Sequence, residues 1–151
     1  MRQVDVAIIG GGPAGLAAAV ELWKKGVRNL VILEREKQLG GILRQCIHDG
    51  FGLRRFKETL SGPEYAQRFI DLVQELGIPY ITEATVLRIT EDKQVYAAAP
   101  KGMVEIQAKA VILTMGCRER TRGAISIPGN RPAGVYTAGT AQAYINLYNK
   151  M

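Results

Sequence analysis

The sequence is poor in the residues that build metal centres and disulfide frameworks. It has one histidine, His48, and two cysteines, Cys46 and Cys117, among 151 residues. The cysteines lie far apart and form no C-x-x-C pair, so we expect neither a zinc site nor any other metal ligand set. We interpret both as reduced thiols of a cytoplasmic protein.

Long apolar runs are also lacking. No run reaches the roughly 20 residues that a membrane-spanning helix needs, so no membrane span is expected. The apolar stretch Val4–Ile9 leads into glycine and proline rather than a small-residue cleavage site, which argues against a signal peptide. With 47% hydrophobic and 23% charged residues, the chain is expected to pack as one ordered domain.

Acidic residues are outnumbered, 14 against 20 lysines and arginines, which gives a net charge of +6. The basic residues are scattered along the chain, and no aromatic-interleaved basic strand of the RNA-binding type is present. We therefore expect no specific nucleic-acid partner. A mildly basic surface also suits a ligand that carries phosphates.

Residues 4–33 have the pattern of a strand–helix–strand unit. Val4–Ile9 is a β-branched run typical of a strand buried on both faces. Pro13 stands at the start of a helix predicted over Ala14–Lys25, and Asn29–Leu33 has the pattern of the second strand. The pattern predicts an α/β fold built on a parallel sheet.

The remaining chain carries weaker signals. A long loop with a short helix is expected between 35 and 62, followed by a helix over Ser61–Glu75. The expected strands are Tyr80–Ile81, Thr85–Ile89, Gln94–Ala98, Val104–Ala108, Ala110–Leu113 and Val135–Thr137, and a helix is expected over Ala141–Tyr148. The second and third of these strands predict a small antiparallel β insertion.

Three glycines follow the first strand with the spacing G-x-G-x-x-G. Gly10 turns the chain sharply, Gly12 lets a pyrophosphate approach the backbone, and Gly15 lets helix and strand pack closely. The free amides and the dipole at the helix start favour phosphate. Glu34, at the end of the second strand, is placed to accept hydrogen bonds from ribose hydroxyls. Its neighbour Arg35 is interpreted as solvated or as covering the adenine.

The pattern extends beyond the loop. Ala19 follows Gly15 after three residues, and Gly26 follows after six more. This longer run resembles the FAD fingerprint of the two-dinucleotide-binding-domain flavoproteins, which include the pyridine nucleotide–disulfide oxidoreductases. The resemblance implies a Rossmann-like FAD/NAD(P)-binding domain, FAD as the cofactor, and NAD(P)H as a second cofactor of the complete protein.

Later segments resemble the same family in order. The stretch after Glu34, through the glycine pair at 40–41, resembles the part that passes the ribose and then the flavin. Val86 resembles the position whose backbone faces adenine, and Thr114–Gly116 resembles the Ala-Thr-Gly motif. The implied cofactor site comprises Gly10, Gly12, Pro13, Ala14, Gly15, Glu34, Arg35, Gly40, Gly41, Ile42, Val86, Thr114, Met115 and Gly116.

The segment Gly40–Ala66 resembles bacterial FAD-dependent oxidoreductases that accompany glycerol-3-phosphate dehydrogenase-type subunits. It is more distantly similar to the α subunits of opine and sarcosine oxidases. Disulfide reductases of the wider family carry C-x4-C after the glycine pair, but here Phe51 stands five positions after Cys46. Disulfide reduction is therefore not expected. Two interpretations stay open for Cys46 and His48: ordinary loop residues, or neighbours of the flavin.

Family members continue into an NAD(P)H domain and return with a Gly-Asp motif, and neither follows Met151. We therefore expect residues 1–151 to be the N-terminal, incomplete FAD-binding part of a longer flavoprotein. It would move hydride or electrons between nicotinamide, or a small-molecule substrate, and FAD.

The alternative is a dinucleotide-binding module that acts only with a partner subunit. The partners considered are FAD, such a subunit or a missing C-terminal domain, and a second copy of the chain. A simple nicotinamide-dependent dehydrogenase is disfavoured by the glycine pair at 40–41 and by the β-hairpin region. A flavoprotein acting on tRNA has no specific feature in its favour.

Overall fold

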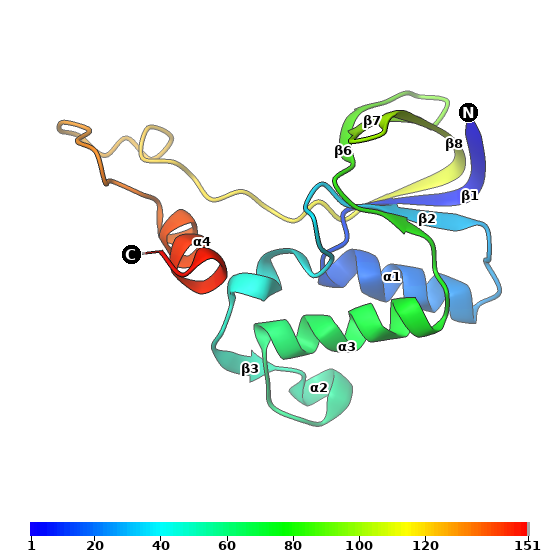
Figure 1. The fold of residues 1–151 in the computed structure, drawn as a ribbon, viewed down its shortest axis with the longest axis horizontal. Coiled ribbons are helices and arrows are strands. Elements are labelled where there is room, and N and C mark those ends of the chain that lie inside the picture. The colour runs from blue at the N-terminus through cyan, green and yellow to red at the C-terminus, as the bar shows by residue number, and fades with distance from the viewer. Residues whose placement is uncertain (151) are drawn as a thin grey trace.

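A six-stranded sheet with helices packed on it forms the body of the protein (Figure 1). The structure, a computed structural model, describes residues 1–150. The strand order is β5-β2-β1-β8-β7-β6. In that order the strands are β5 (Tyr80–Ile81), β2 (Leu30–Leu33), β1 (Arg2–Ile9), β8 (Gly102–Leu113), β7 (Gln94–Ala99) and β6 (Thr85–Ile89).

The first four strands of this order run parallel. β1 pairs with β2 on one side, where Ile9 lies opposite Leu33, and with β8 on the other, where Ile9 lies opposite Leu113. The helix α1 (Pro13–Lys24) connects β1 to β2. Because the strands are parallel, the carboxyl ends of β1, β2 and β8 meet at one edge of the sheet. The predicted strand–helix–strand unit is confirmed.

β8 serves both parts of the sheet. Its final residues pair in parallel with β1, whereas its first residues pair antiparallel with β7, which in turn pairs antiparallel with β6. The predicted hairpin is therefore confirmed as the antiparallel insertion. The prediction of two separate strands, Val104–Ala108 and Ala110–Leu113, is wrong, because one continuous strand crosses Lys109, whose side chain extends to Asp5 on β1.

Each face of the sheet buries its own core. α1 and α3 (Gly62–Glu75) cover one face (Figure 1). The buried residues there are Val6, Ile8, Leu16, Ala19, Val20, Leu30, Ile32, Leu39, Phe69, Val73 and Ile78. The core on the other face consists of Val4, Ala7, Ile9, Val31, Leu33, Ala84, Val95, Ala97, Ile106 and Ala108. β1 and β2 contribute to both cores, which explains their unbroken apolar sequences.

The region between 35 and 62 is more structured than the expected loop. It contains η1 (Gly41–Gln45), β3 (Asp49–Phe51), α2 (Leu53–Phe56) and β4 (Leu60–Ser61), and β3 pairs antiparallel with β4. Aromatic rings hold this region on α3: Phe56 lies 5.5 Å from Phe69, and Phe51 lies 6.2 Å from Tyr65, between ring centroids. The expected short helix is present, but elements as short as η1, β3 and β4 carry no periodicity in the sequence, which is why these were not predicted.

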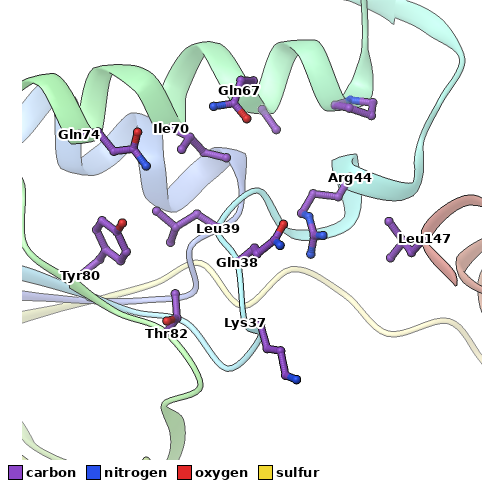
Figure 2. A pocket seen from close by; sticks show the side chains of 12 residues that line it. Lys37, Gln38, Leu39, Arg44, Gln67, Ile70, Gln74, Tyr80, Thr82 and Leu147 are labelled. Carbon is purple, nitrogen blue, oxygen red and sulfur yellow. The ribbon is translucent and has the colours of Figure 1, made fainter.

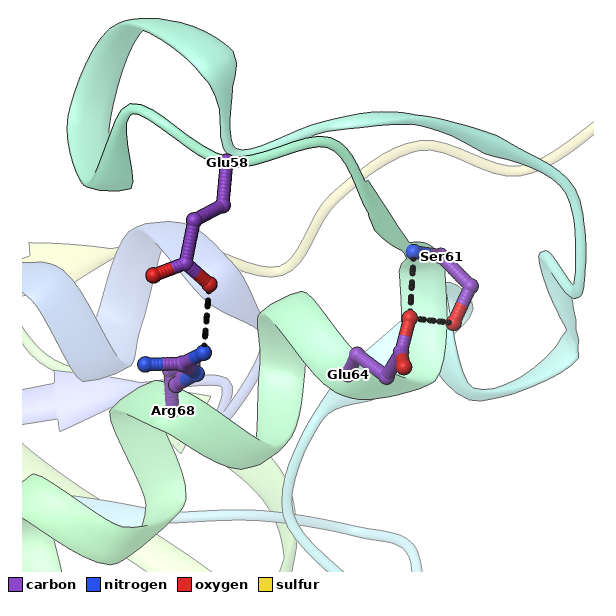
Figure 3. A network of polar contacts seen from close by, with 4 residues as sticks. All are labelled: Glu58, Ser61, Glu64 and Arg68. Carbon is purple, nitrogen blue, oxygen red and sulfur yellow. Dashed lines mark hydrogen bonds and ion pairs between the residues drawn. The ribbon is translucent and has the colours of Figure 1, made fainter.

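α3 begins with a capping box (Figure 3). The Glu64 carboxylate accepts hydrogen bonds from the Ser61 backbone N–H at 2.8 Å and from the Ser61 hydroxyl at 2.7 Å. Both bonds favour the ionised form, so they lower the pKa of Glu64 below its ordinary value of 4.5. Arg68, one turn further on, pairs with Glu58 at 2.6 Å and ties α3 to the segment between α2 and β4.

The chain after β8 departs furthest from the prediction. Residues 114–137 contain no helix or strand, so the expected strand Val135–Thr137 is wrong; Thr137 is instead the N-cap of α4 (Ala138–Tyr148). That helix begins three residues earlier than predicted. No helix within residues 1–150 combines the length and the apolar character that crossing a membrane would require.

Candidate functional site

The candidate site lies where β1, β2 and β8 end together. Gly10 follows β1, Glu34 follows β2 and Thr114 follows β8. The Gly10 N–H donates to the Leu33 carbonyl at 2.8 Å, and the Thr114 N–H donates to the Ile9 carbonyl at 2.8 Å. The three strand ends predicted to carry site residues are therefore joined by backbone hydrogen bonds.

Thr114 fixes the turn out of β1. Its hydroxyl Oγ1 lies 2.9 Å from the carbonyl oxygens of both Ile9 and Gly10. Gly10 has a φ of +110°, and a Cβ there would lie 2.4 Å from the Thr114 carbonyl oxygen. A side chain at position 10 is therefore excluded both by the backbone conformation and by the approach of Thr114.

Gly15 permits the closest contact in the loop. A Cβ at this position would lie 1.9 Å from the Gly10 carbonyl oxygen and 2.8 Å from Thr114 Oγ1. Since Gly15 lies in the first turn of α1, any larger residue would push the helix away from the end of β1. This is the packing role that the spacing predicted for the third glycine.

The start of α1 is open to a ligand. Its N-cap is Gly12, which has no capping side chain, and its first turn contains no acidic residue. Pro13 has no N–H, and the backbone amides of Gly12, Ala14 and Gly15 find no backbone or side-chain acceptor within residues 1–150. Unpaired amides at the positive end of a helix dipole form a site for phosphate.

The glycine pair after β2 returns to this loop. The Gly40 N–H donates to the Gly11 carbonyl at 2.8 Å. A Cβ at Gly41 would lie 2.9 Å from the Cα of Gly12. Two backbone segments far apart in the sequence therefore pack without side chains between them beside the open end of α1.

The Glu34 side chain lies beside the glycine loop and is hydrogen-bonded to it. Its side chain is only 5% exposed, and Oε2 accepts the Gly11 N–H at 2.6 Å while Oε1 accepts the Glu36 N–H at 2.8 Å. A carboxylate has about four lone-pair directions, so acceptor capacity is left for ribose hydroxyls. Gly11 was not among the site residues predicted from the sequence, although the run of three consecutive glycines was an available signal.

Arg35 and Val86, two further residues predicted to line the site, lie in different surroundings. The Arg35 side chain is exposed and its Nε lies 3.2 Å from Glu36, and no hydrogen bond or ion pair joins it to the glycine loop within residues 1–150. Val86 lies on the edge strand β6, opposite Ala97 of β7. The turn before β6 lies beside the end of β2, because the Ala84 N–H donates to the Glu34 carbonyl at 2.9 Å. Val86 follows this turn two residues after Ala84, on the same side of the sheet edge as Glu34.

The residues expected beside the flavin form an open surface. Ile42 is 61% exposed and Met115 is 66% exposed, and Gly116 has a φ of +67°. Cys46 is partly buried, with its Sγ 3.4 Å from the Ile42 carbonyl, and the exposed His48 ring lies 5.3 Å from Phe51. No group of three or more potential metal ligands occurs within the described residues.

A separate groove of about 430 Å³ lies between α3 and the segment 37–39 (Figure 2). It is lined by side chains of α3, by residues 37–39, by Arg44 of η1, by Tyr80 and Thr82 at β5, and by Leu147 of α4. None of the phosphate-loop glycines lines it. The candidate cofactor site is therefore an open surface lined by backbone amides. The groove is a separate feature, lined in part by residues of the segment 37–44.

Comparisons with known proteins agree with this geometry. Residues 3–49 match the protein family described as "FAD binding domain". The chain is 35% identical over 150 residues to an opine oxidase subunit of Agrobacterium tumefaciens, covering 91% of this chain and 28% of that protein. It is 30% identical over 129 residues to an NADH dehydrogenase of Bacillus subtilis, covering 84% of this chain and 23% of that protein.

The crystal structure of L-proline dehydrogenase from P. horikoshii has a similar fold. The TM-score is 0.78 at 25% identity, and the match covers 98% of this chain and 29% of that one. The chain thus spans less than a third of the length of these relatives. The predicted similarity to opine oxidases is confirmed, whereas the resemblance to proteins accompanying glycerol-3-phosphate dehydrogenase-type subunits stays a prediction.

The parallel sheet and the open glycine loop define a dinucleotide-binding domain of the Rossmann type. The family match and the similar structures specify the dinucleotide, FAD. The chain is thus an FAD-binding domain, similar to one segment of much longer oxidases and dehydrogenases.

Proposed function

We propose that the loop Gly10–Gly15 holds the pyrophosphate of FAD, and that the domain serves an oxidoreductase passing hydride or electrons between nicotinamide, or a small-molecule substrate, and FAD. The observation that carries the proposal is the open start of α1. The amides of Gly12, Ala14 and Gly15 have no acceptor there within the described chain. Phosphate oxygens would supply the missing acceptors.

The adenosine half of the cofactor would lie toward β2. The Glu34 carboxylate, held by Gly11 and Glu36, would accept hydrogen bonds from the ribose hydroxyls. The same negative charge would repel a 2′-phosphate, which disfavours NADP at this loop. The backbone of Val86, on the free edge of β6, would meet the adenine.

The flavin half would extend over the glycine pair and the end of β8. FAD supplies the redox chemistry, since its ring accepts and releases a hydride or electrons. The chain's role there is to bind and orient: Gly40, Gly41 and Ile42 would line one side, and Thr114, Met115 and Gly116 the other. The Thr114 hydroxyl anchors the second of these segments to the Gly10 carbonyl at 2.9 Å.

Anaerobic titration tests the proposed electron transfer. The FAD-loaded chain would be mixed with NADH or NADPH, and bleaching of the flavin absorption band would be followed in a stopped-flow instrument. Bleaching faster than that of free FAD supports a nicotinamide reaction. Loading with FAD but no acceleration by either nicotinamide would contradict a nicotinamide reaction carried out by this chain alone, and would favour substrate oxidation or a reaction that needs a partner.

A second function, a binding module completed by a partner subunit, is favoured by one observation. α4, the segment before it and the end of β8 expose large apolar side chains, and α4 has no buried residue. The exposed residues are Leu113, Met115, Ile125, Ile127, Val135, Tyr136, Tyr144, Ile145, Leu147 and Tyr148. Exposed apolar patches of this kind commonly mark interaction surfaces. The relative from Agrobacterium tumefaciens is itself named as one subunit of an oxidase.

Sedimentation velocity at several protein concentrations tests this second function. A partner-dependent module with an open apolar face should self-associate as its concentration rises, and Tyr148→Lys should shift the equilibrium toward monomer. A wild-type chain that stays monomeric at every concentration, with an unchanged profile for the variant, would weigh against it.

A further inference from the structure

We propose that Glu119 and Gln45 are positioning residues that meet at Gly139 and close a ring of contacts around the flavin end of the cofactor site, an inference that rests on the proposed FAD binding. The Gly139 N–H donates to Glu119 Oε2 at 2.9 Å, and the Gly139 carbonyl accepts from Gln45 Nε2 at 3.2 Å. We call this meeting point the Gly139 junction.

The junction closes a loop of chain segments and hydrogen bonds that starts and ends at the glycine loop. Thr114 binds the Gly10 carbonyl at 2.9 Å, and the chain runs from Thr114 to Glu119. On the other side, the Gly40 N–H donates to the Gly11 carbonyl at 2.8 Å, and the chain runs through η1 to Gln45. The two segments proposed to flank the flavin thus start together at the loop and are joined again at Gly139.

Glu119 makes the contact with α4. Its carboxylate accepts the Gly139 N–H and the hydroxyls of Thr137 and Thr140, so a residue 18 positions upstream of Thr137 caps the helix. The Thr137 hydroxyl and the Gly139 N–H lower the pKa of Glu119 below its ordinary 4.5. The carboxylate is therefore ionised at neutral pH, and its charge matches the positive end of the helix dipole.

Gly139 is shaped for this contact. A Cβ at position 139 would lie 3.0 Å from Glu119 Oε2 and 3.1 Å from both Glu119 Cδ and Oε1. The neighbouring atoms belong to the end of a flexible side chain, so alanine would displace the carboxylate at little cost to the backbone. Gly139→Ala is therefore a second way to open the junction without removing Glu119.

Gln45 makes the contact with η1. It is 8% exposed, which is unusual for an amide side chain. Its Nε2 donates to Gln142 Oε1 at 2.9 Å as well as to Gly139, and its backbone carbonyl accepts from Asn146 Nδ2 at 2.7 Å. α4 has no buried apolar residue, so these hydrogen bonds hold it beside η1 (Figure 1).

The ring has a specific consequence for ligand binding. ADP would reach only the glycine loop and Glu34, outside the junction, whereas the flavin half of FAD would also lie between the two joined segments. Opening the junction should therefore weaken FAD while leaving ADP unaffected. A role limited to stabilising the whole fold would weaken both ligands together.

The test is calorimetric titration of the purified chain with ADP and with FAD. Glu119→Ala and Gly139→Ala should each lower the affinity for FAD about tenfold, on the scale of one charge-assisted hydrogen bond, with the affinity for ADP unchanged. Glu119→Gln, which keeps an acceptor oxygen, should restore part of the loss. The controls are Glu91→Ala, an exposed glutamate in the β6–β7 turn, and Gly123→Ala, which has open space around it.

Hydrogen exchange of the ligand-free chain gives an independent readout. Both junction variants should exchange faster than wild type at residues 41–45 and 138–142, and the controls should not. Equal weakening of ADP and FAD, or no weakening of either with unchanged exchange, would overturn the junction. A wild-type chain that binds neither ligand would instead refute FAD binding itself, and the junction's role with it.

Discussion

Substitution of Gly12 separates binding from folding more cleanly than any other change in the loop. Gly12 has a φ of −76° and a ψ of −175°, an extended conformation that any residue adopts. A Cβ added there would find its nearest neighbour, the Cα of Gly41, at 3.8 Å, which is ordinary van der Waals contact. We therefore expect Gly12→Val to fold, with a free energy of unfolding within about 1 kcal/mol of wild type.

Binding should respond quite differently. The valine would occupy the space in front of the free amides of Gly12, Ala14 and Gly15, through which a pyrophosphate must approach. Each hydrogen bond to a charged group contributes about 1.5–3 kcal/mol, so the loss of two weakens binding by about 3–6 kcal/mol. The dissociation constants for FAD and ADP should both rise by roughly 100-fold or more.

Urea unfolding and titration calorimetry on the same preparations measure the two effects. Gly123→Val is the matched control, because Gly123 has nothing within 4 Å of its built Cβ and lies outside the left-handed region. A folded Gly12→Val variant that binds FAD as tightly as wild type would refute the assignment of the phosphate to this loop.

Three further predictions concern single residues. Gly15→Ala should unfold the loop or the domain, because its Cβ would lie 1.9 Å from the Gly10 carbonyl oxygen, and circular dichroism should show a lowered Tm. Glu34→Ala should weaken FAD by about 1–3 kcal/mol in calorimetry, and it should also lower stability, since Gly11 and Glu36 lose their acceptor; an unchanged affinity would contradict the ribose contact. The folded-state pKa of Glu64 is lowered, so its cap on α3 contributes fully above the ordinary pKa of 4.5 and is lost as the pH falls through the lower value. Glu64→Gln should flatten the dependence of stability on pH in that acidic range, and an identical dependence in the variant would count against the cap.

The first third of the fold was predictable because its local signals agree. β1 and β2 are buried on both faces and consist of apolar runs, and Pro13 marks the helix between them. The contacts that the spacing assigned to Gly10 and Gly15 are present in the structure. The joining of Glu34 to Gly11 was not predictable, because a side chain reaching across 23 positions leaves no periodic signal.

The secondary structure of the later part of the chain was harder to predict from the sequence, for physical reasons. β8 combines a parallel half and an antiparallel half, so Lys109 looked like a break between two strands although it is an exposed position within one. Val135–Thr137 has strand-like residues, yet Thr137 serves as the start of α4 because Glu119 caps that helix from a distant segment. Tertiary contacts decided both outcomes.

A competition titration tests the central claim most directly. The purified chain would be loaded with FAD, followed through the fluorescence of the flavin, and then challenged with ADP or with FMN. Binding through the glycine loop and Glu34 predicts that ADP displaces FAD in a saturable manner and that FMN, which lacks the adenosine and one of the two phosphates, does not. Displacement by FMN but not by ADP, or no binding of FAD at all, would contradict the account.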